Sequence, residues 1–321
     1  MSIKHIIIVL GEPYSTFSEI IGNYLSKKNN LNKSKKITII GNIELFYNQL
    51  KKLNYRINLN EIKDLGQARK SIINFINIEY KHKKIFGKIS HLSSIYIEKS
   101  FEKSLEMIKK YDDCILINGP ISKRSFLKKK YLGITEYLSK KTKSNGEIML
   151  IYNKNLSVSP LTTHIPLKHV AKNINKKRIL NHVIKINNFY KKTLKRTANF
   201  AVLGLNPHCE SIDNFNEDEK IILPSINEIK KKKIKIKGPF PADTFFLKEN
   251  FSKFNVVLGM YHDQVLTPIK TLYKFEAINI TLGLPFIRLS PDHGPNFSML
   301  GKNKSDPSSF IYALKFINDL K

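Results

Sequence analysis

The stretch His5-Ile6-Ile7-Ile8-Val9-Leu10-Gly11-Glu12-Pro13 decides the fold class of this chain of 321 residues. An apolar, β-branched run of strand length is followed at once by a polar turn. The same order returns at Ile115-Leu116-Ile117-Asn118-Gly119-Pro120, and lysine-rich amphipathic stretches separate such runs. Continuous apolar strands between helices are typical of a mainly parallel sheet that is covered on both faces. The sequence therefore predicts an α/β protein.

The alternation of strands and helices continues along the whole chain. We expect strands at residues 6–10, 36–40, 114–118, 147–152, 157–161, 200–205, 256–259 and 277–281. We expect helices at residues 16–26, 43–52, 65–78, 95–110, 166–171, 176–193, 217–231 and 307–320. Ligands bind at the carboxyl edge of the strands in open α/β sheets. The polar turns that follow the expected strands therefore locate the functional site.

The net charge of +29 raises the possibility of a nucleic-acid-binding protein. Arginine, which binds phosphates and base edges through two hydrogen bonds, is scarce. It occurs only at Arg56, Arg69, Arg124, Arg178, Arg196 and Arg288. We interpret lysine runs such as 128–130 and 230–233 as solvated faces. We expect no nucleic-acid partner, and a basic nucleic-acid-binding protein without catalysis is the alternative from another class.

No apolar run reaches the ~20 residues that span a bilayer, so we expect no membrane partner. Met1-Ser2-Ile3-Lys4 leads straight into the first strand, and we expect no signal peptide. Two cysteines, Cys114 and Cys209, indicate no disulfide framework and are typical of reduced thiols. We therefore expect a cytoplasmic protein.

Three of the nine histidines, His164, His208 and His262, lie in tight polar turns. Three imidazoles that leave coordination positions open suit a catalytic divalent metal, with zinc the natural choice and cobalt an alternative. Such a metal polarises a substrate oxygen and lowers its pKa, and Asp263 is placed to orient a ligand. These histidines are 44 and 54 residues apart, so spacing alone leaves open that they are unrelated loop residues.

Two further groups are candidates for the site. In Gly238-Pro239-Phe240-Pro241-Ala242-Asp243-Thr244, two prolines fix the backbone before Asp243 and aim its carboxylate, or else Asp243 is a helix N-cap. Arg288 follows an apolar stretch and suits a carboxylate or phosphate, or else forms a surface ion pair. Lys270 and Asn279 belong to the same group. The chain contains no Gly-x-Gly, so a nicotinamide cofactor must be held without the usual dinucleotide fingerprint.

Together these segments resemble the 4-hydroxythreonine-4-phosphate dehydrogenase (PdxA) family. The matching stretches occur in the family's order and at its spacings: TTHIPL (162–167), GLNPH (204–208), GPFPADTF (238–245), YHDQ (261–264), NITLGLPFIR (279–288) and DHG (292–294). Weaker matches are NGPISK (118–123) and Gly11-Glu12-Pro13 with Glu19. The resemblance covers nearly the whole chain and is densest from residue 115 onward.

The resemblance implies two α/β/α domains flanking a cleft, as in isocitrate and isopropylmalate dehydrogenases, and a homodimer with a shared active site. We expect residues 1–125 plus 275–321 in the first domain and 126–274 in the second. The residues implied as metal ligands, one of them from the neighbouring subunit, are His164, His208 and His262. The residues implied as substrate contacts are Thr135, Lys270, Asn279 and Arg288.

The implied reaction is NAD-dependent and metal-dependent oxidation of 4-phosphohydroxy-L-threonine to 2-amino-3-oxo-4-phosphooxybutanoate. That product decarboxylates to 3-amino-2-oxopropyl phosphate in pyridoxine 5'-phosphate biosynthesis. NADP is the alternative to NAD, and magnesium or cobalt are the alternatives to zinc. The proton acceptor is Asp243, Asp263 or Lys270, which the sequence does not rank.

The chain departs from the family around the expected cleft. Isoleucine stands at Ile134, where the family has a histidine that contacts the substrate, and isoleucine cannot donate a hydrogen bond. Residues 14–18, 209–211 and 295–298 also differ from the family pattern. These changes keep open a related dehydrogenase of another phosphorylated hydroxy acid, such as a threonate phosphate. A metal-dependent hydrolase using the same three histidines is a further alternative.

Overall fold

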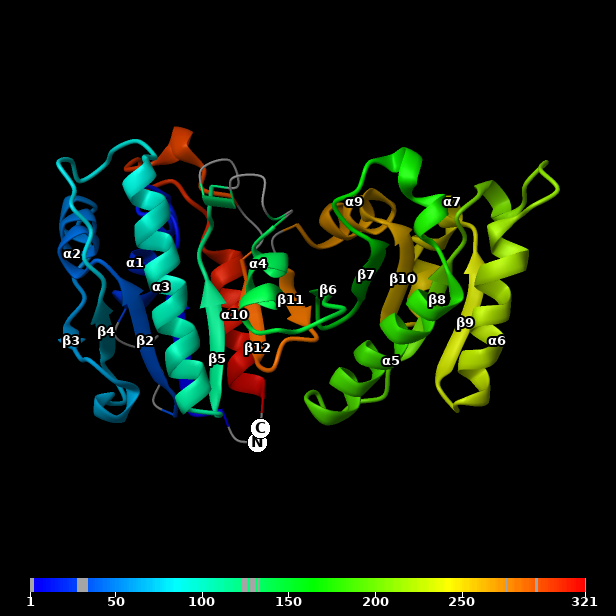
Figure 1. Ribbon diagram of the computed structural model, residues 1–321, viewed down its shortest axis with the longest axis horizontal. Coiled ribbons are helices and arrows are strands. Elements are labelled where there is room, and N and C mark those ends of the chain that lie inside the picture. Colours follow the sequence, from blue (N-terminus) through cyan, green and yellow to red (C-terminus); the bar gives the residue numbers. More distant parts are fainter. Residues whose placement is uncertain are drawn as a thin grey trace. The chain divides into compact units, whose positions relative to one another are not determined.

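The computed structural model describes residues 3–27, 34–122, 126–127, 131, 133–274, 276–291 and 294–320. Strands and helices alternate along these ranges, which confirms the α/β class (Figure 1). The chain divides into two compact units. Unit 1 comprises Met1–Asn145 and Leu284–Lys321, and unit 2 comprises Gly146–Gly283.

The unit bounds differ from the expected ones, 125/126 and 274/275. Residues 126–145 belong with unit 1 because Leu127, Tyr137 and Leu138 are buried in its core. Residues 275–283 belong with unit 2 because β11 (Ile278–Leu282) pairs with β6 (Ile148–Tyr152). Both differences come from tertiary packing that has no local sequence signal.

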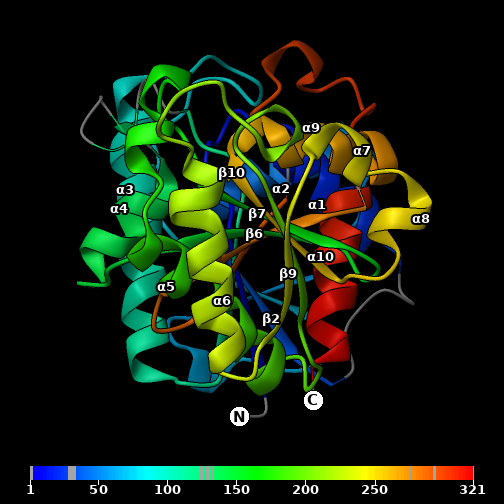
Figure 2. The ribbon, with the colours of Figure 1, turned by 90° about the vertical axis from the view of Figure 1, so that its right-hand side faces the viewer.

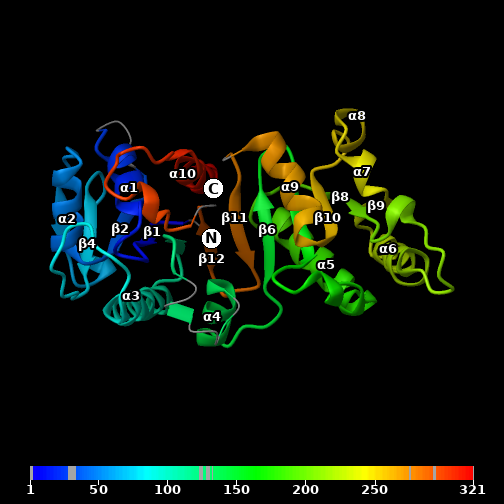
Figure 3. The same ribbon diagram turned by 90° about the horizontal axis from the view of Figure 1, so that it is seen from above.

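Unit 1 is a parallel sheet with helices on both faces. Its described strands lie in the order β3 (Leu59–Glu61), β4 (Ile73–Asn77), β2 (Lys36–Gly41), β1 (His5–Val9), β5 (Cys114–Asn118) and β12 (Ile287–Ser290). Every residue of β1 and β5 is buried, as expected for a sheet covered on both sides. Figure 3 shows α1 (Phe17–Leu25), α2 (Ile43–Lys52) and α10 (Ser308–Asp319) on one face, and α3 (His91–Lys110) and α4 (Ile134–Lys141) on the other.

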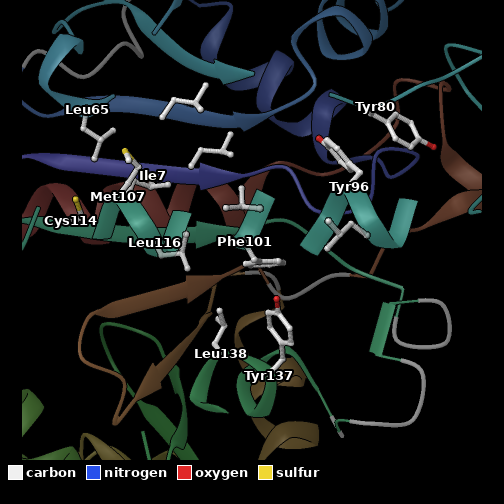
Figure 4. Packing of buried hydrophobic residues seen from close by; sticks show 14 of the residues in the cluster. Ile7, Leu65, Tyr80, Tyr96, Phe101, Met107, Cys114, Leu116, Tyr137 and Leu138 are labelled. Carbon is white, nitrogen blue, oxygen red and sulfur yellow. The ribbon is translucent and has the colours of Figure 1, made fainter. Parts of the chain in front are cut away.

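A single apolar cluster fills the space between α3, α4 and the sheet (Figure 4). Figure 4 shows Leu116 of β5 beside Phe101 of α3, and the ring centre of Phe101 is 5.9 Å from that of Tyr137 on α4. Burial of side chains of this size contributes roughly 1.5–3 kcal/mol each. This packing fixes α4, which starts at Ile134 beside the expected substrate contacts.

The expected helix at residues 65–78 is wrong. Only Leu65–Gln67 forms a short 3-10 helix, and Ile73–Asn77 is β4, a parallel neighbour of β2. Ser71 adopts a left-handed backbone conformation with φ 60°, which ends any helix before the strand. Residues 73–76 are buried, and the run from Ile72 to Ile76 is rich in isoleucine and contains Phe75, which favours a strand.

Unit 2 has a mixed sheet. Its described strands lie in the order β11, β6, β7 (Ser157–Thr162), β10 (Val256–Tyr261), β8 (Asn199–Leu203) and β9 (Lys235–Phe240). The strand β6 is antiparallel to both neighbours, and the pairs from β7 to β9 are parallel. Figure 2 shows α5 (Lys176–Lys192) and α6 (Leu223–Lys231) on one side of these strands, and α7 (Ala242–Phe245), α8 (Lys248–Phe251) and α9 (His262–Tyr273) on the other. Within the described ranges, no helix is long and apolar enough to cross a bilayer.

Candidate active site

Three neighbouring parallel strands of unit 2 carry the three histidines to one edge. His164 lies two residues after β7 ends, His262 begins α9 directly after β10, and His208 lies five residues after β8. The carboxyl ends of parallel strands meet at the same edge of a sheet, which is the upper edge of unit 2 in Figure 1. The topology therefore brings together residues whose spacing gave no reason to expect it.

The rings of His164 and His262 lie side by side. Their centres are 5.8 Å apart, and their planes are inclined by 40°. Two imidazoles that each place a nitrogen about 2 Å from a shared ion have ring centres roughly 5–6 Å apart. The two rings are therefore close enough to share a divalent metal. His164 is exposed and His262 is half-buried, so both rings are accessible to a ligand.

Asp263 orients the His262 ring. Its Oδ1 is 2.6 Å from His262 Nδ1 and accepts the hydrogen bond when that nitrogen carries the proton. In that tautomer the Nε2 lone pair is free for a metal, which is the usual arrangement of a metal-binding histidine backed by a carboxylate. The contact supports the predicted role of Asp263 beside a ligand.

His208 stands on the same edge but apart from this pair. It lies in the short helix Pro207–Cys209 with a left-handed backbone, φ 56°, and its side chain is exposed. Among the described residues, no group of three or more His, Cys, Asp or Glu side chains is placed to hold a metal ion. One chain thus assembles two of the three predicted ligands, and the three-histidine site stays a prediction.

A buried carboxylate holds the turn that carries His208. Asp218 accepts hydrogen bonds from the backbone N–H groups of Leu205 (2.8 Å) and Asn206 (3.1 Å), and from Asn206 Nδ2 (3.0 Å). A Cβ atom at Gly204 would lie 2.7 Å from both Asp218 Oδ1 and Cys209 Sγ, so only glycine fits there. Asp218 was not predicted as a site residue, because it lies inside an expected helix and holds backbone atoms of another segment.

Asp243 and Lys270, the other candidate proton acceptors, are both exposed in unit 2. Asp243 lies in the first turn of α7, just past the end of β9, and Pro241 occupies the N-cap position. The N-cap interpretation of Asp243 is therefore wrong. Lys270 lies eight residues after His262 on α9, which places it roughly 12 Å further along the helix axis.

The second constellation lies within unit 1 and is centred on Arg288 of β12. Its side chain is 1% exposed, so the surface ion-pair interpretation is wrong. The Nε atom donates to Asn118 Oδ1 at 2.7 Å, and Nη1 donates to Thr135 Oγ1 at 3.1 Å. Burial lowers the pKa of Arg288 to about 10, an effect that nearby Glu136 opposes. Two of the predicted substrate contacts thus meet in one chain, held by Asn118.

The remaining predicted site residues are more widely distributed. Asn279 lies on β11 of unit 2, and its Oδ1 is buried without a hydrogen-bond partner among the described residues. Ile134 is the first residue of α4, next to Thr135. Asp292 and His293 of the DHG stretch, and Lys123 of NGPISK, lie outside the described residues.

The sequence matches the family described as "Pyridoxal phosphate biosynthetic protein PdxA" over residues 33–317. The chain belongs to the PdxA family. A 4-hydroxythreonine-4-phosphate dehydrogenase from Sulfurihydrogenibium sp. is 38% identical, with 98% of this chain and 97% of that relative covered. A Clostridium botulinum relative, provisionally named a D-threonate 4-phosphate dehydrogenase, is 29% identical, with 96% of this chain and 94% of that relative covered. The PdxA chain is therefore an oxidoreductase, as the sequence predicts.

Solved structures agree with this assignment. The fold is similar to that of a 4-hydroxythreonine-4-phosphate dehydrogenase from Klebsiella pneumoniae, with a TM-score of 0.84, 25% identity and coverage of 98% of this chain and 99% of that one. An isocitrate dehydrogenase from Methylococcus capsulatus has a TM-score of 0.50 at 8% identity, with 98% and 85% covered. That second likeness concerns the fold alone, and it confirms the isocitrate-dehydrogenase-like fold class of this PdxA chain.

Proposed function

We propose that this PdxA chain oxidises 4-phosphohydroxy-L-threonine with NAD and a divalent metal, in pyridoxine 5'-phosphate biosynthesis. The observation that carries the proposal is the His164–His262 pair, 5.8 Å apart, with Asp263 behind His262. A bound cation, most simply zinc, would lower the pKa of the substrate hydroxyl while NAD accepts the hydride. The product, a β-keto acid, then loses carbon dioxide to give 3-amino-2-oxopropyl phosphate.

We assign His164 and His262 to the metal from one chain and His208 to the same site from a second copy. Large apolar side chains are exposed close to these histidines along the chain: Ile212 and Phe215 follow His208, and Leu167 follows His164. Exposed apolar groups of this size are typical of surfaces that another subunit covers. A homodimer would bury them and supply the third imidazole at the same place.

The proton acceptor is Asp243 or Lys270 in this proposal. Asp263 is engaged with His262 Nδ1, so its carboxylate serves to hold the ring. Asp243 and Lys270 are exposed, and either the Asp243 carboxylate or the neutral amine form of Lys270 can take the hydroxyl proton in the complex. Replacing each by its uncharged counterpart, Asp243→Asn and Lys270→Met, distinguishes them, because only the acceptor's variant should lose the basic-pH plateau of kcat.

Arg288 and Thr135 are suited to the anionic end of the substrate. A guanidinium held by Asn118 has a fixed orientation and needs no reordering when it meets a phosphate. On unit 2, the unpartnered Oδ1 of Asn279 is suited to accept a hydrogen bond from a substrate hydroxyl or ammonium group. The proposal keeps Lys270 as a further contact of the same substrate.

An NAD-reduction assay on 4-phosphohydroxy-L-threonine, run with and without a chelator, tests the proposal. We expect activity that the chelator abolishes and added zinc or cobalt restores. His208→Ala should abolish NADH formation and reduce bound metal, whereas the control His169→Ala, an exposed histidine of the same unit, should do neither. Near-normal turnover of His208→Ala would contradict the assignment of His208 as a metal ligand.

A related dehydrogenase of D-threonate 4-phosphate is the second candidate. Ile134 favours it, because this chain lacks the side-chain donor that the family has beside Thr135. A panel of both phosphorylated acids, compared by kcat/KM, decides between the two substrates.

A further inference from the structure

The strand ends that carry the three histidines are tied together by hydrogen bonds around one buried residue, Met260. Gln264 Oε1 accepts a hydrogen bond from Met260 N at 2.7 Å, and Thr162 Oγ1 donates to Met260 O at 2.7 Å. Gln264 Nε2 donates to Gly204 O, also at 2.7 Å. We call Thr162, Met260, Gln264 and Gly204 the Met260 bridge. Its three side-chain hydrogen bonds connect β7, β10 and the turn after β8.

Each histidine stands only a few residues from a member of the bridge. His164 follows Thr162 by two residues, His262 precedes Gln264 by two, and His208 follows Gly204 by four. Thr162 and Met260 are at most 1% exposed, and Gln264 is 9% exposed, so water competes little for these hydrogen bonds. A shift in any one strand end therefore changes the hydrogen bonds that hold the other two.

The amide of Gln264 has little freedom to move. A Cβ atom at Gly259 would lie 3.0 Å from Gln264 Oε1 and 2.4 Å from Val265 Cγ1, so the backbone of β10 is packed directly against it. Both ends of the amide are used, one as acceptor and one as donor. The side chain thus acts as a spacer of fixed length between β10 and the turn after β8.

We propose that Gln264 and Thr162 are positioning residues, which fix the strand ends so that His164 and His262 meet at one metal site and His208 reaches the site that it shares with a second copy. The inference rests on the proposed metal site. Metal–nitrogen distances tolerate only about 0.2 Å of error. Residues that hold ligands in place commonly change metal affinity by about 10- to 100-fold.

The first test replaces Gln264 by methionine, which keeps its length and removes both hydrogen bonds. The Kd of the full chain for cobalt(II) is measured by competition with a chromogenic chelator, together with the visible spectrum of the cobalt form. Gln49→Met is the matched control, because Gln49 is 2% exposed and donates to the Pro13 and Ile85 carbonyls in unit 1. Both variants should lose similar thermal stability, and only Gln264→Met should weaken cobalt binding, by about 10- to 100-fold.

A second pair keeps the inference testable if Gln264→Met does not fold. Thr162→Val keeps the shape and loses the hydroxyl, whereas Thr162→Ser keeps the hydroxyl. We expect weaker cobalt binding and an altered spectrum for Thr162→Val, and wild-type values for Thr162→Ser. Unchanged cobalt affinity in both Gln264→Met and Thr162→Val, or an equal loss in Gln49→Met, overturns the positioning role while the metal site stands. Failure of the unaltered chain to bind cobalt or zinc overturns the proposed function, and this inference with it.

Discussion

The Arg288 group of unit 1 and the histidine edge of unit 2 differ in how they hold the side chains that we propose to bind ligands. In unit 1 the side chain that we propose to bind the anion, Arg288, is buried, and Asn118 and Thr135 already hold it. In unit 2 the histidine side chains are exposed or half-buried, while the backbone beneath them is fixed by the Met260 bridge and Asp218.

The difference follows from what each group is suited to hold. A guanidinium carries its own charge and can be fixed before the anion arrives, at the cost of burying a cation. Three neutral imidazoles bind an ion that supplies the positive charge and fixes the distances between them. The protein therefore only has to place the strand ends that carry the histidines. We therefore expect substitutions in the two regions to change protein stability and ligand affinity in different proportions.

Arg288→Met should have the largest effect on function. Removing a prepared anion contact should lower kcat/KM by about 10²- to 10³-fold. The melting temperature should change little, since relief of the buried cation offsets the two lost hydrogen bonds. Steady-state kinetics and thermal unfolding measure both quantities. Arg178→Met, on the surface of α5, is the control, and an equal loss of activity there would contradict the prediction.

Glu12→Gln should change how the stability depends on pH. Glu12 is 1% exposed, and neither of its carboxyl oxygens has a hydrogen-bond partner among the described residues. Burial raises the pKa of Glu12 to about 7, and the nearby Ser93 side chain and Tyr14 backbone oppose this shift only weakly. The folded chain then keeps a neutral carboxyl that the unfolded chain ionises above its ordinary pKa of 4.5. Stability from this group is therefore present below pH 4.5 and is lost as the pH rises to 7.

The free energy of unfolding of Glu12→Gln should accordingly equal that of the wild type at pH 4. At pH 8 it should be higher by about 2–3 kcal/mol. Urea unfolding at both pH values measures the difference. Glu44→Gln, an exposed position in α2, should show no such change with pH. A Glu12→Gln advantage of the same size at both pH values would show that buried charge in unit 1 is not its cause.

Asp263→Asn tests the histidine edge of unit 2. An amide in place of the carboxylate holds His262 less firmly and makes the ring a poorer donor to the metal, so Kd for zinc should rise by about 10- to 100-fold. Competition with a fluorescent chelator measures it. The control is Asp112→Asn, an exposed aspartate of unit 1. Unchanged zinc affinity in Asp263→Asn would mean that the contact with His262 is incidental.

Ile134→His, a substitution beside the Arg288 group of unit 1, should have the smallest effect. A donor placed beside Thr135 should lower KM for 4-phosphohydroxy-L-threonine by about 3- to 10-fold, the size of one net hydrogen bond. Ile134→Leu has the same size and no donor, and it should leave KM as it is. If both variants raise KM equally, packing at the start of α4 governs the site, and the missing donor does not.

The sequence predicts the two central strands of unit 1 well, whereas the buried strand β4 was expected to be a helix. The strands β1 and β5 lie within one residue of the expected ranges because both of their faces are buried, which gives continuous apolar runs. The strand β9 alternates lysine with apolar residues and was not predicted. The helix α9 was missed because Pro268 lies in its interior, where proline usually argues against a helix.

The candidate site was predictable in part. The histidines and Arg288 stand out by residue type in short polar or apolar contexts. Asp218 and Gln264 do not, since each holds a backbone atom of another segment, 12 residues away for Asp218 with Asn206 and 60 for Gln264 with Gly204. Such partners become visible only when strand order is known, because no local spacing encodes them.

Strand β12 has a consequence for how the chain matures. Its Arg288 reaches Asn118 across 170 residues of sequence, and the whole of unit 2 is synthesised between these two positions. On the ribosome, β5 therefore waits for its last neighbour until nearly the entire chain has emerged. The Arg288–Asn118 contact therefore forms late in biosynthesis, and a nascent chain that stops short of residue 288 lacks the guanidinium that makes it.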